Sequence, residues 1–109
     1  MLVLFDNGTP RTLARYLIDQ HTVTEARARE WDRLENGELL AVAEAAGFDV
    51  LVSTDRNLRY QQNLTGRKIA VVVLGKGRWT LIQHKITDII AAVNAAKPGS
   101  YTEVEIPAG

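Results

Sequence analysis

Three short stretches of the chain are almost wholly apolar, and each ends at a polar residue or at glycine. They are LVLF (2–5), VLVS (50–53) and IAVVVL (69–74). A strand that is apolar on both faces is typical of a parallel sheet with helices on both sides. The longest run, 69–74, is expected to be a central strand. These runs therefore predict an α/β domain.

The segments between these runs carry helix signals. Thr9 is expected to cap a helix that begins at Pro10, because threonine is a good N-cap and proline suits the first helical position. Asn36 is expected to cap a helix over 37–46, and Gly47 follows where a left-handed residue is needed. The expected buried residues of the two helices are Leu13, Leu17 and Ile18, and Leu39, Val42, Ala43 and Ala46.

The remaining elements complete an alternating pattern. A second strand is expected in HTVTEA (21–26), and RAREWDRLE (27–35) is ambiguous between a loop and a short helix. A helical apolar stripe covers 79–93, and YTEVEI (101–106) alternates as an edge strand does. Strands that alternate with helices predict a three-layer α/β/α sandwich with a mainly parallel sheet. The length of 109 residues fits one domain over 1–109.

Composition excludes few function classes. The chain has 13 basic and 13 acidic residues, so its overall charge does not indicate a nucleic-acid or membrane partner. It has no cysteine, which excludes disulfides and thiolate metal sites. The apolar run at 2–5 is too short for a signal peptide or a membrane span. We therefore expect a soluble, cytoplasmic protein without a membrane partner.

Three carboxylates are expected at one edge of the sheet. Asp6 follows the first strand, Asp55 follows VLVS, and Glu38 lies in the first turn of the helix that leads into VLVS. Ligands of open parallel sheets bind beyond the carboxyl ends of the strands. Each acid also has an ordinary explanation: an Asx turn for Asp6, the helix dipole for Glu38, and a helix cap for Asp55.

Carboxylates that converge repel one another unless a cation lies among them. A cluster of oxygen ligands suits a hard ion, so Mg²⁺ or Mn²⁺ is the expected cofactor, able to activate water near a phosphoryl group. His21 and His84 do not fall at this edge and are expected to be structural or solvated.

Basic and polar residues near the same edge could hold a nucleic-acid backbone, or could simply form a solvated surface. Tyr60 and Gln61 in YQQNL could contact RNA, although amides also serve to satisfy loop backbone groups. Trp31 and Trp79 are expected to anchor the core or an interface. The candidate substrate-binding residues are Arg11, Asn36, Thr54, Arg56, Arg59, Tyr60 and Gln61.

Several of these motifs together resemble a known family. FDNGTP, NGELL, GFDVLVSTDRNL and YQQNL, followed by IAVVVL, are similar to a small group of PIN-like domains that resemble the toxins of bacterial toxin–antitoxin systems. The resemblance covers the chain from Leu2 to about Val93. It implies a three-layer α/β/α fold, Mg²⁺- or Mn²⁺-dependent cleavage of RNA, and an antitoxin protein as partner.

The resemblance also implies roles for individual residues. Asp6, Glu38 and Asp55 would be the catalytic and metal-binding acids, and Asn57 would bind the metal or its water. One further acid that is common in PIN domains has no clear counterpart, although Glu25 and Glu30 lie in roughly the right region.

Other interpretations remain open. A haloacid dehalogenase-like phosphatase would need a second acid where Gly8 stands, and a receiver domain would need an acid pair in its first loop. A catalytically silent PIN-like module that binds a protein partner or RNA would have the same fold as the nuclease. The strand expected at 101–106 also leaves a homodimer possible.

Overall fold

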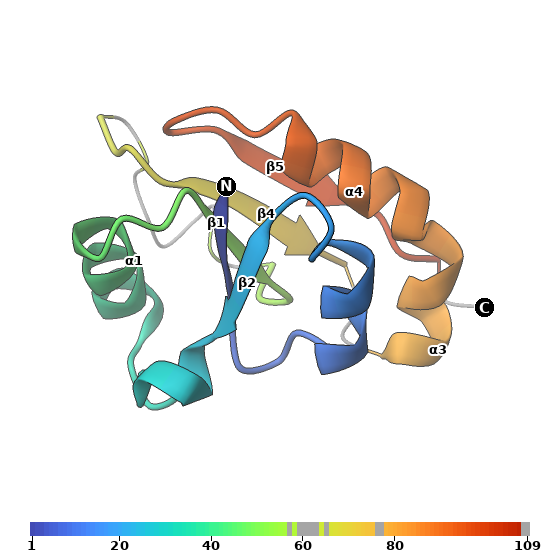
Figure 1. Ribbon diagram of the computed structural model, residues 1–109, viewed down its shortest axis with the longest axis horizontal. Helices are drawn as coiled ribbons and strands as arrows, with labels where there is room; N and C mark the ends of the chain where they lie inside the picture. The colour runs from blue at the N-terminus through green and yellow to red at the C-terminus, as the bar shows by residue number, and fades with distance from the viewer. Residues whose placement is uncertain (57, 59–63, 65, 76–77, 108–109) are drawn as a thin grey trace.

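The computed structural model describes residues 1–56, 58, 64, 66–75 and 78–107. These residues form a five-stranded sheet in the order β2-β1-β3-β4-β5, with every neighbouring pair parallel (Figure 1). The strands are β1 (Leu2–Phe5), β2 (Thr22–Glu25), β3 (Val50–Ser53), β4 (Ala70–Leu74) and β5 (Tyr101–Val104). The prediction of a mainly parallel α/β sheet is confirmed, and β5 is an edge strand as expected.

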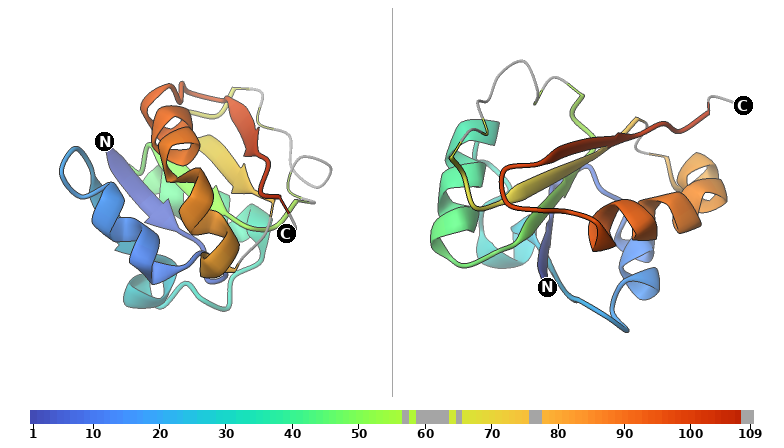
Figure 2. Two further views of the ribbon diagram at one scale, coloured as in Figure 1. Left: turned by 90° about the vertical axis from the view of Figure 1, so that its right-hand side faces the viewer. Right: turned by 90° about the horizontal axis from the view of Figure 1, so that it is seen from above.

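Helices cover both faces of this sheet (Figure 2). One face packs against the 3-10 helix η1 (Arg11–Tyr16), α3 (Trp79–Ile82) and α4 (Ile86–Asn94). The other packs against η2 (Ala26–Arg29) and α1 (Asn36–Ala45). A further 3-10 turn, η3 (Gln83–Lys85), joins α3 to α4. The described residues thus form three layers.

The central strands are buried on both faces because their side chains alternate between two cores. Val3 and Phe5 of β1 enter the core beneath η1 and α4, whereas Leu4 enters the core beneath α1. β3 divides in the same way, with Val50 and Val52 on one side and Leu51 on the other. Continuous apolar runs are therefore what this sheet requires.

The structure corrects both predicted helix caps. Thr9 does not cap η1: Pro10 occupies that position, and the buried Thr9 hydroxyl donates to the carbonyl of Val52 at 2.9 Å. Asn36 is the first residue of α1 rather than its cap, which is Glu35. Local sequence rules assign both side chains to helix capping. In the structure each instead forms a hydrogen bond with β3 or the loop after it, Thr9 with Val52 and Asn36 with Asp55.

Further details of the helices differ from expectation. Ile18 is 59% exposed, and Ala46 is also exposed, whereas Leu40 is buried. The expected helix over 79–93 is interrupted at η3. Gly47 has φ of +90° as predicted, and it directly follows Ala46, the C-cap of α1. Among the described residues, no helix has both the length and the apolar character needed to cross a membrane.

Candidate functional site

The carboxyl edge of the sheet has a change in chain direction between β1 and β3. From β1 the chain moves to β2 on one side, then crosses back to β3 on the other side of β1. In open α/β sheets of this strand order, ligands bind at the carboxyl edge where the direction of winding reverses. Asp6 follows β1 and Asp55 follows β3, so both predicted acids flank this point.

One buried hydroxyl links these two acids. Ser53, the last residue of β3, is completely buried, and its Oγ donates to Oδ2 of Asp6 at 2.8 Å. The same Oγ accepts the backbone N–H of Asp55 at 3.1 Å. The other carboxylate oxygen of Asp6, Oδ1, accepts the N–H of Asn7 at 2.7 Å. Ser53 therefore fixes the Asp6 carboxylate relative to the start of the loop after β3.

The amino end of α1 meets Asp55. Asn36 Nδ2 donates to Oδ2 of Asp55 at 2.8 Å, which places the first turn of α1 at the carboxyl edge as predicted. The positive end of the helix dipole favours a carboxylate there. Glu38 lies in this same first turn and is exposed.

The donor set at this edge suits a hard divalent ion. Asp6 and Asp55 are both partly exposed, and Mg²⁺ commonly binds one or two protein carboxylates together with waters and substrate phosphates. Within 1–56 and the other described residues, no three His, Cys, Asp or Glu side chains are gathered closely enough to hold a metal ion. The structure thus joins Asp6 to the Asp55 loop, and the three-acid centre with Glu38 stays a prediction.

The loops after β1 and β3 also pack closely. A Cβ on Gly8 would lie 2.6 Å from the Thr54 hydroxyl oxygen, so glycine permits this approach. The backbone N–H of Asp6 donates to the carbonyl of Val52 at 2.9 Å, which extends the contact between β1 and β3 by one residue. Thr54, predicted to contact substrate, therefore lies where the loop after β3 meets the loop after β1.

Two of the predicted cationic residues already have carboxylate neighbours. Arg11 lies 3.2 Å from Glu25, and Arg56 lies 3.8 Å from Glu103. Both arginines are well exposed, so each pair contributes little to stability and a substrate phosphate could compete for the guanidinium. Their charges are nonetheless partly balanced within the protein.

Two pockets lie on either side of the acid pair. The smaller, of about 40 Å³, is lined by Asp6, Arg11, Glu25 and Arg27 among others. The larger, of about 260 Å³, lies beyond the ends of β4 and β5, where Arg56, Gly75 and Glu103 line it. The smaller pocket therefore lies directly beside Asp6, whereas the described residues that line the larger pocket include Arg56 but neither aspartate.

Four predicted site residues, Asn57, Arg59, Tyr60 and Gln61, lie outside the described residues. Ser53 was not predicted, because a serine that ends an apolar strand has no distinctive pattern. No role was predicted for Arg27 either, whose Nη2 lies 3.4 Å from Oδ1 of Asn7. Glu25, one of the two residues considered for the further acid, shares the smaller pocket with Asp6.

His21 and the two tryptophans make contacts within the fold, whereas His84 is exposed. His21 contacts Asn94 Oδ1 at 2.7 Å at the start of β2, and His84 is exposed in η3. Trp79 stacks on Tyr16 with ring centroids 5.9 Å apart, and Trp31 packs edge-on against Phe48.

Comparison of the chain with protein-family models, with curated proteins and with solved structures gives no match.

Proposed function

We propose that this protein is a PIN-like, Mg²⁺- or Mn²⁺-dependent endoribonuclease. The observation that carries the proposal is the hydroxyl of Ser53, which joins Asp6 to the Asp55 loop at the point where the sheet reverses its winding. Two carboxylates that a buried hydroxyl holds in place are suitable ligands for a hard cation. The resemblance of FDNGTP and GFDVLVSTDRNL to PIN-like domains supports the same reading.

Each residue of the proposed centre has a defined task. Asp6 and Asp55 would hold the cation, and Glu38, which is exposed in the first turn of α1, would be the third acid. Ser53 and Asn36 orient the two aspartates through their hydrogen bonds. The bound ion would activate a water and stabilise the charge that develops on the phosphodiester.

The neighbouring cations would hold the RNA backbone. Arg11 and Arg56 lie on opposite sides of the acid pair, each next to one of the two pockets. A phosphate that replaced Glu25 or Glu103 as partner would gain a charge-assisted contact at small cost, because both arginines are well exposed. Thr54 and Asn36 would contact the substrate between these cations.

The test is cleavage of a mixed RNA by the purified protein with Mn²⁺ or Mg²⁺. We expect wild type to cleave, EDTA to abolish cleavage, and Asp6→Asn or Asp55→Asn to remove it without loss of fold by circular dichroism. Asp49→Asn is the matched control: Asp49 accepts the N–H of Leu2 at the opposite edge of the sheet, and an amide oxygen keeps that bond. Cleavage that survives both EDTA and Asp6→Asn would remove the proposal.

The alternative function is a silent module that binds RNA or a protein partner. A protein that binds RNA in a filter assay, ignores Mn²⁺ in calorimetry and leaves RNA intact would support that alternative. Glu38→Gln separates the roles further: loss of cleavage places Glu38 in the centre, whereas wild-type activity restricts the centre to the two aspartates.

We also propose that the nuclease acts as the toxin of a toxin–antitoxin pair in the cytoplasm, with an antitoxin protein as partner. Induced expression in bacteria should then arrest growth, and Asp6→Asn should relieve the arrest. A small open reading frame next to the gene is the expected source of the antitoxin. Normal growth with abundant wild-type protein would contradict the toxin role and leave the nuclease proposal standing.

A further inference from the structure

Two aromatic side chains stack where η1 and α3 lie side by side. The ring of Tyr16, in η1, stacks on the ring of Trp79, in α3, with centroids 5.9 Å apart. Trp79 is partly buried and packs on the core beneath these helices. Tyr16 is 46% exposed and is not one of the side chains of either core. The contact with Trp79 therefore holds an aromatic ring that is still open to solvent.

The surface around this aromatic pair is basic, although the chain has no net charge. The elements η1, α3 and η3 contain no Asp or Glu, and the first acids that follow, Asp19 and Asp88, lie in the turn after η1 and in α4. Arg15 lies in η1, and Arg78 directly precedes α3. Both arginines are exposed, and neither forms an ion pair with another described residue. Unpaired cations beside an open aromatic ring favour a ligand that is both anionic and aromatic.

The helix η1 connects this pair to the proposed metal centre. It begins shortly after Asp6, and Arg11 at its start lines the smaller pocket together with Asp6. At a rise of about 2 Å per residue, Tyr16 lies roughly 10 Å along η1 from Arg11. A short polynucleotide would thus be able to place one phosphate beside Arg11 and a nearby base on Tyr16.

We propose that Tyr16 and Trp79 form a stacking platform for an unpaired base of single-stranded RNA, with Arg15 and Arg78 on the adjacent phosphates. Proteins commonly bind single strands through aromatic rings that stack on bases and a basic surface that follows the backbone. Here a base on the open side of Tyr16 extends a stack that already exists. Duplex RNA keeps its bases within its own stack, so it does not use the platform. The inference rests on the proposed function in taking RNA as the ligand.

Fluorescence tests binding without cleavage. The chain has two tryptophans, so Trp31→Phe leaves Trp79 as the reporter and keeps a ring against Phe48. In EDTA, a single-stranded RNA of about ten nucleotides, within the usual range of site sizes, should quench this fluorescence. A duplex of the same length and inorganic polyphosphate should leave it unchanged, because neither offers an unpaired base.

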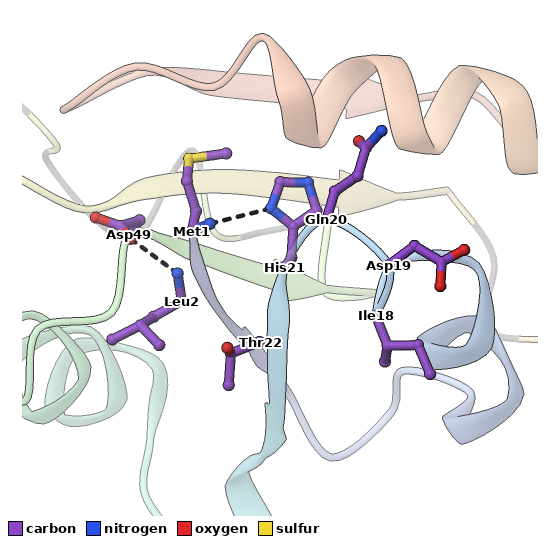
Figure 3. A pocket seen from close by; sticks show the side chains of 8 residues that line it. All are labelled: Met1, Leu2, Ile18, Asp19, Gln20, His21, Thr22 and Asp49. Atoms are coloured by element: carbon purple, nitrogen blue, oxygen red, sulfur yellow. Dashed lines mark hydrogen bonds between the residues drawn. The ribbon is translucent and has the colours of Figure 1, made fainter.

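The role of Tyr16 is tested by the anisotropy of the same single strand carrying a fluorescent label, which does not need Trp31→Phe. Tyr16→Ala should weaken binding about tenfold, an effect typical of the loss of one stacked base, whereas Tyr16→Phe should bind as wild type does. Ile18→Ala is the matched control. Ile18 is 59% exposed but lines a different pocket, at the start of β2 (Figure 3), so its loss should leave the affinity unchanged.

The two arginines are tested by salt dependence. Each phosphate contact on a single strand contributes about 0.7 to the slope of log K against log salt concentration. Arg15→Gln/Arg78→Gln should therefore reduce the slope by about 1.4. Lys97→Gln removes an exposed cation beyond the end of α4 and should leave the slope unchanged.

The results that would overturn the platform differ from those that would remove the nuclease. No quenching of Trp79 by the single strand, which a surface for a protein partner would also give, would overturn the platform. So would wild-type affinity in Tyr16→Ala, or equal affinity for duplex and single strand. Metal-dependent cleavage at Asp6 and Asp55 could stand in all three cases. Binding in EDTA that follows these expectations, without cleavage in Mn²⁺, would support the platform and remove the nuclease.

Discussion

Replacement of Ser53 by alanine is the sharpest test of the hydrogen-bond network at the carboxyl edge. The hydroxyl is completely buried, donates to the Asp6 carboxylate at 2.8 Å and accepts from the Asp55 N–H at 3.1 Å. A hydrogen bond to a charged group contributes about 1.5–3 kcal/mol, and a neutral one about 0.5–1.5 kcal/mol. Water can partly replace the hydroxyl at the half-buried Asp6, so we expect Ser53→Ala to lower the free energy of unfolding by about 2–4 kcal/mol.

Urea unfolding followed by circular dichroism measures this loss directly. For a domain near 100 residues the same change would lower Tm by roughly 10–20 °C. Ser100→Ala is the matched control, because Ser100 Oγ accepts one exposed N–H, from Lys97 at 3.1 Å. Its removal should cost about 1 kcal/mol or less. Equal losses in the two variants would refute the structural role that we assign to Ser53.

A double-mutant cycle isolates the contact between Ser53 and Asp6. The single changes Ser53→Ala and Asp6→Ala remove the same hydrogen bond, so their costs should not add. We expect a coupling free energy of about 1–2 kcal/mol, in the range found for residues in one hydrogen-bond network. Strictly additive costs would mean that the two side chains do not interact in solution.

Three further perturbations test other parts of the structure. Gly8→Ala should cost about 1–3 kcal/mol of unfolding free energy, because its Cβ would meet the Thr54 hydroxyl at 2.6 Å; adding Thr54→Ala should recover part of the loss in urea unfolding. Gly47→Ala should lower the free energy of unfolding by about 1 kcal/mol, because φ of +90° strains a residue with a Cβ. No atom lies within 4 Å of the new Cβ, so a loss of several kcal/mol would contradict this prediction. The hydrogen bond from the backbone N–H of Lys68 holds the pKa of Glu44 below 4.5, although desolvation opposes it. The stability that Glu44 contributes is therefore present above its unfolded pKa and is lost as the pH falls through the lower, folded pKa. Glu44→Gln should make Tm depend less on pH below about 4.5. A profile of Tm against pH that matches wild type would contradict the assignment.

The fold was predictable because its strongest signals are local. β1, β3 and β4 are nearly continuous apolar runs, and each lies within one residue of its predicted bounds. Runs of this kind can be buried on both faces only in a covered, parallel sheet. The interruption of the last helical stripe at η3 was not predictable, because Trp79 and Ile86 both pack on the same core and so preserve the apolar period across the break.

The errors at the helix caps have a common physical cause. Thr9 and Asn36 are good N-cap residues, and sequence rules consider only the backbone groups next to them. In the structure the Thr9 hydroxyl binds Val52, 43 residues away, and the Asn36 amide binds Asp55, 19 residues away. Partners at such distances in sequence cannot be read from a local pattern. Ser53 was not predicted to link the two acids for the same reason, because its acceptor, Asp6, lies 47 residues away.

The position of Asp6 shows why a buried strand in this chain ends on a carboxylate. The backbone of Asp6 is already engaged, since its N–H donates to Val52 and its C=O accepts from Thr9. The turn after β1 thus has main-chain bonds of its own, and the side chain adds only a short contact with the N–H of Asn7. What the fold supplies specifically for this carboxylate is a buried hydroxyl on the neighbouring strand. An alanine at position 6 would leave the turn with these main-chain bonds but would deprive Ser53 of its acceptor, so the carboxylate belongs to the edge of the sheet rather than to the turn.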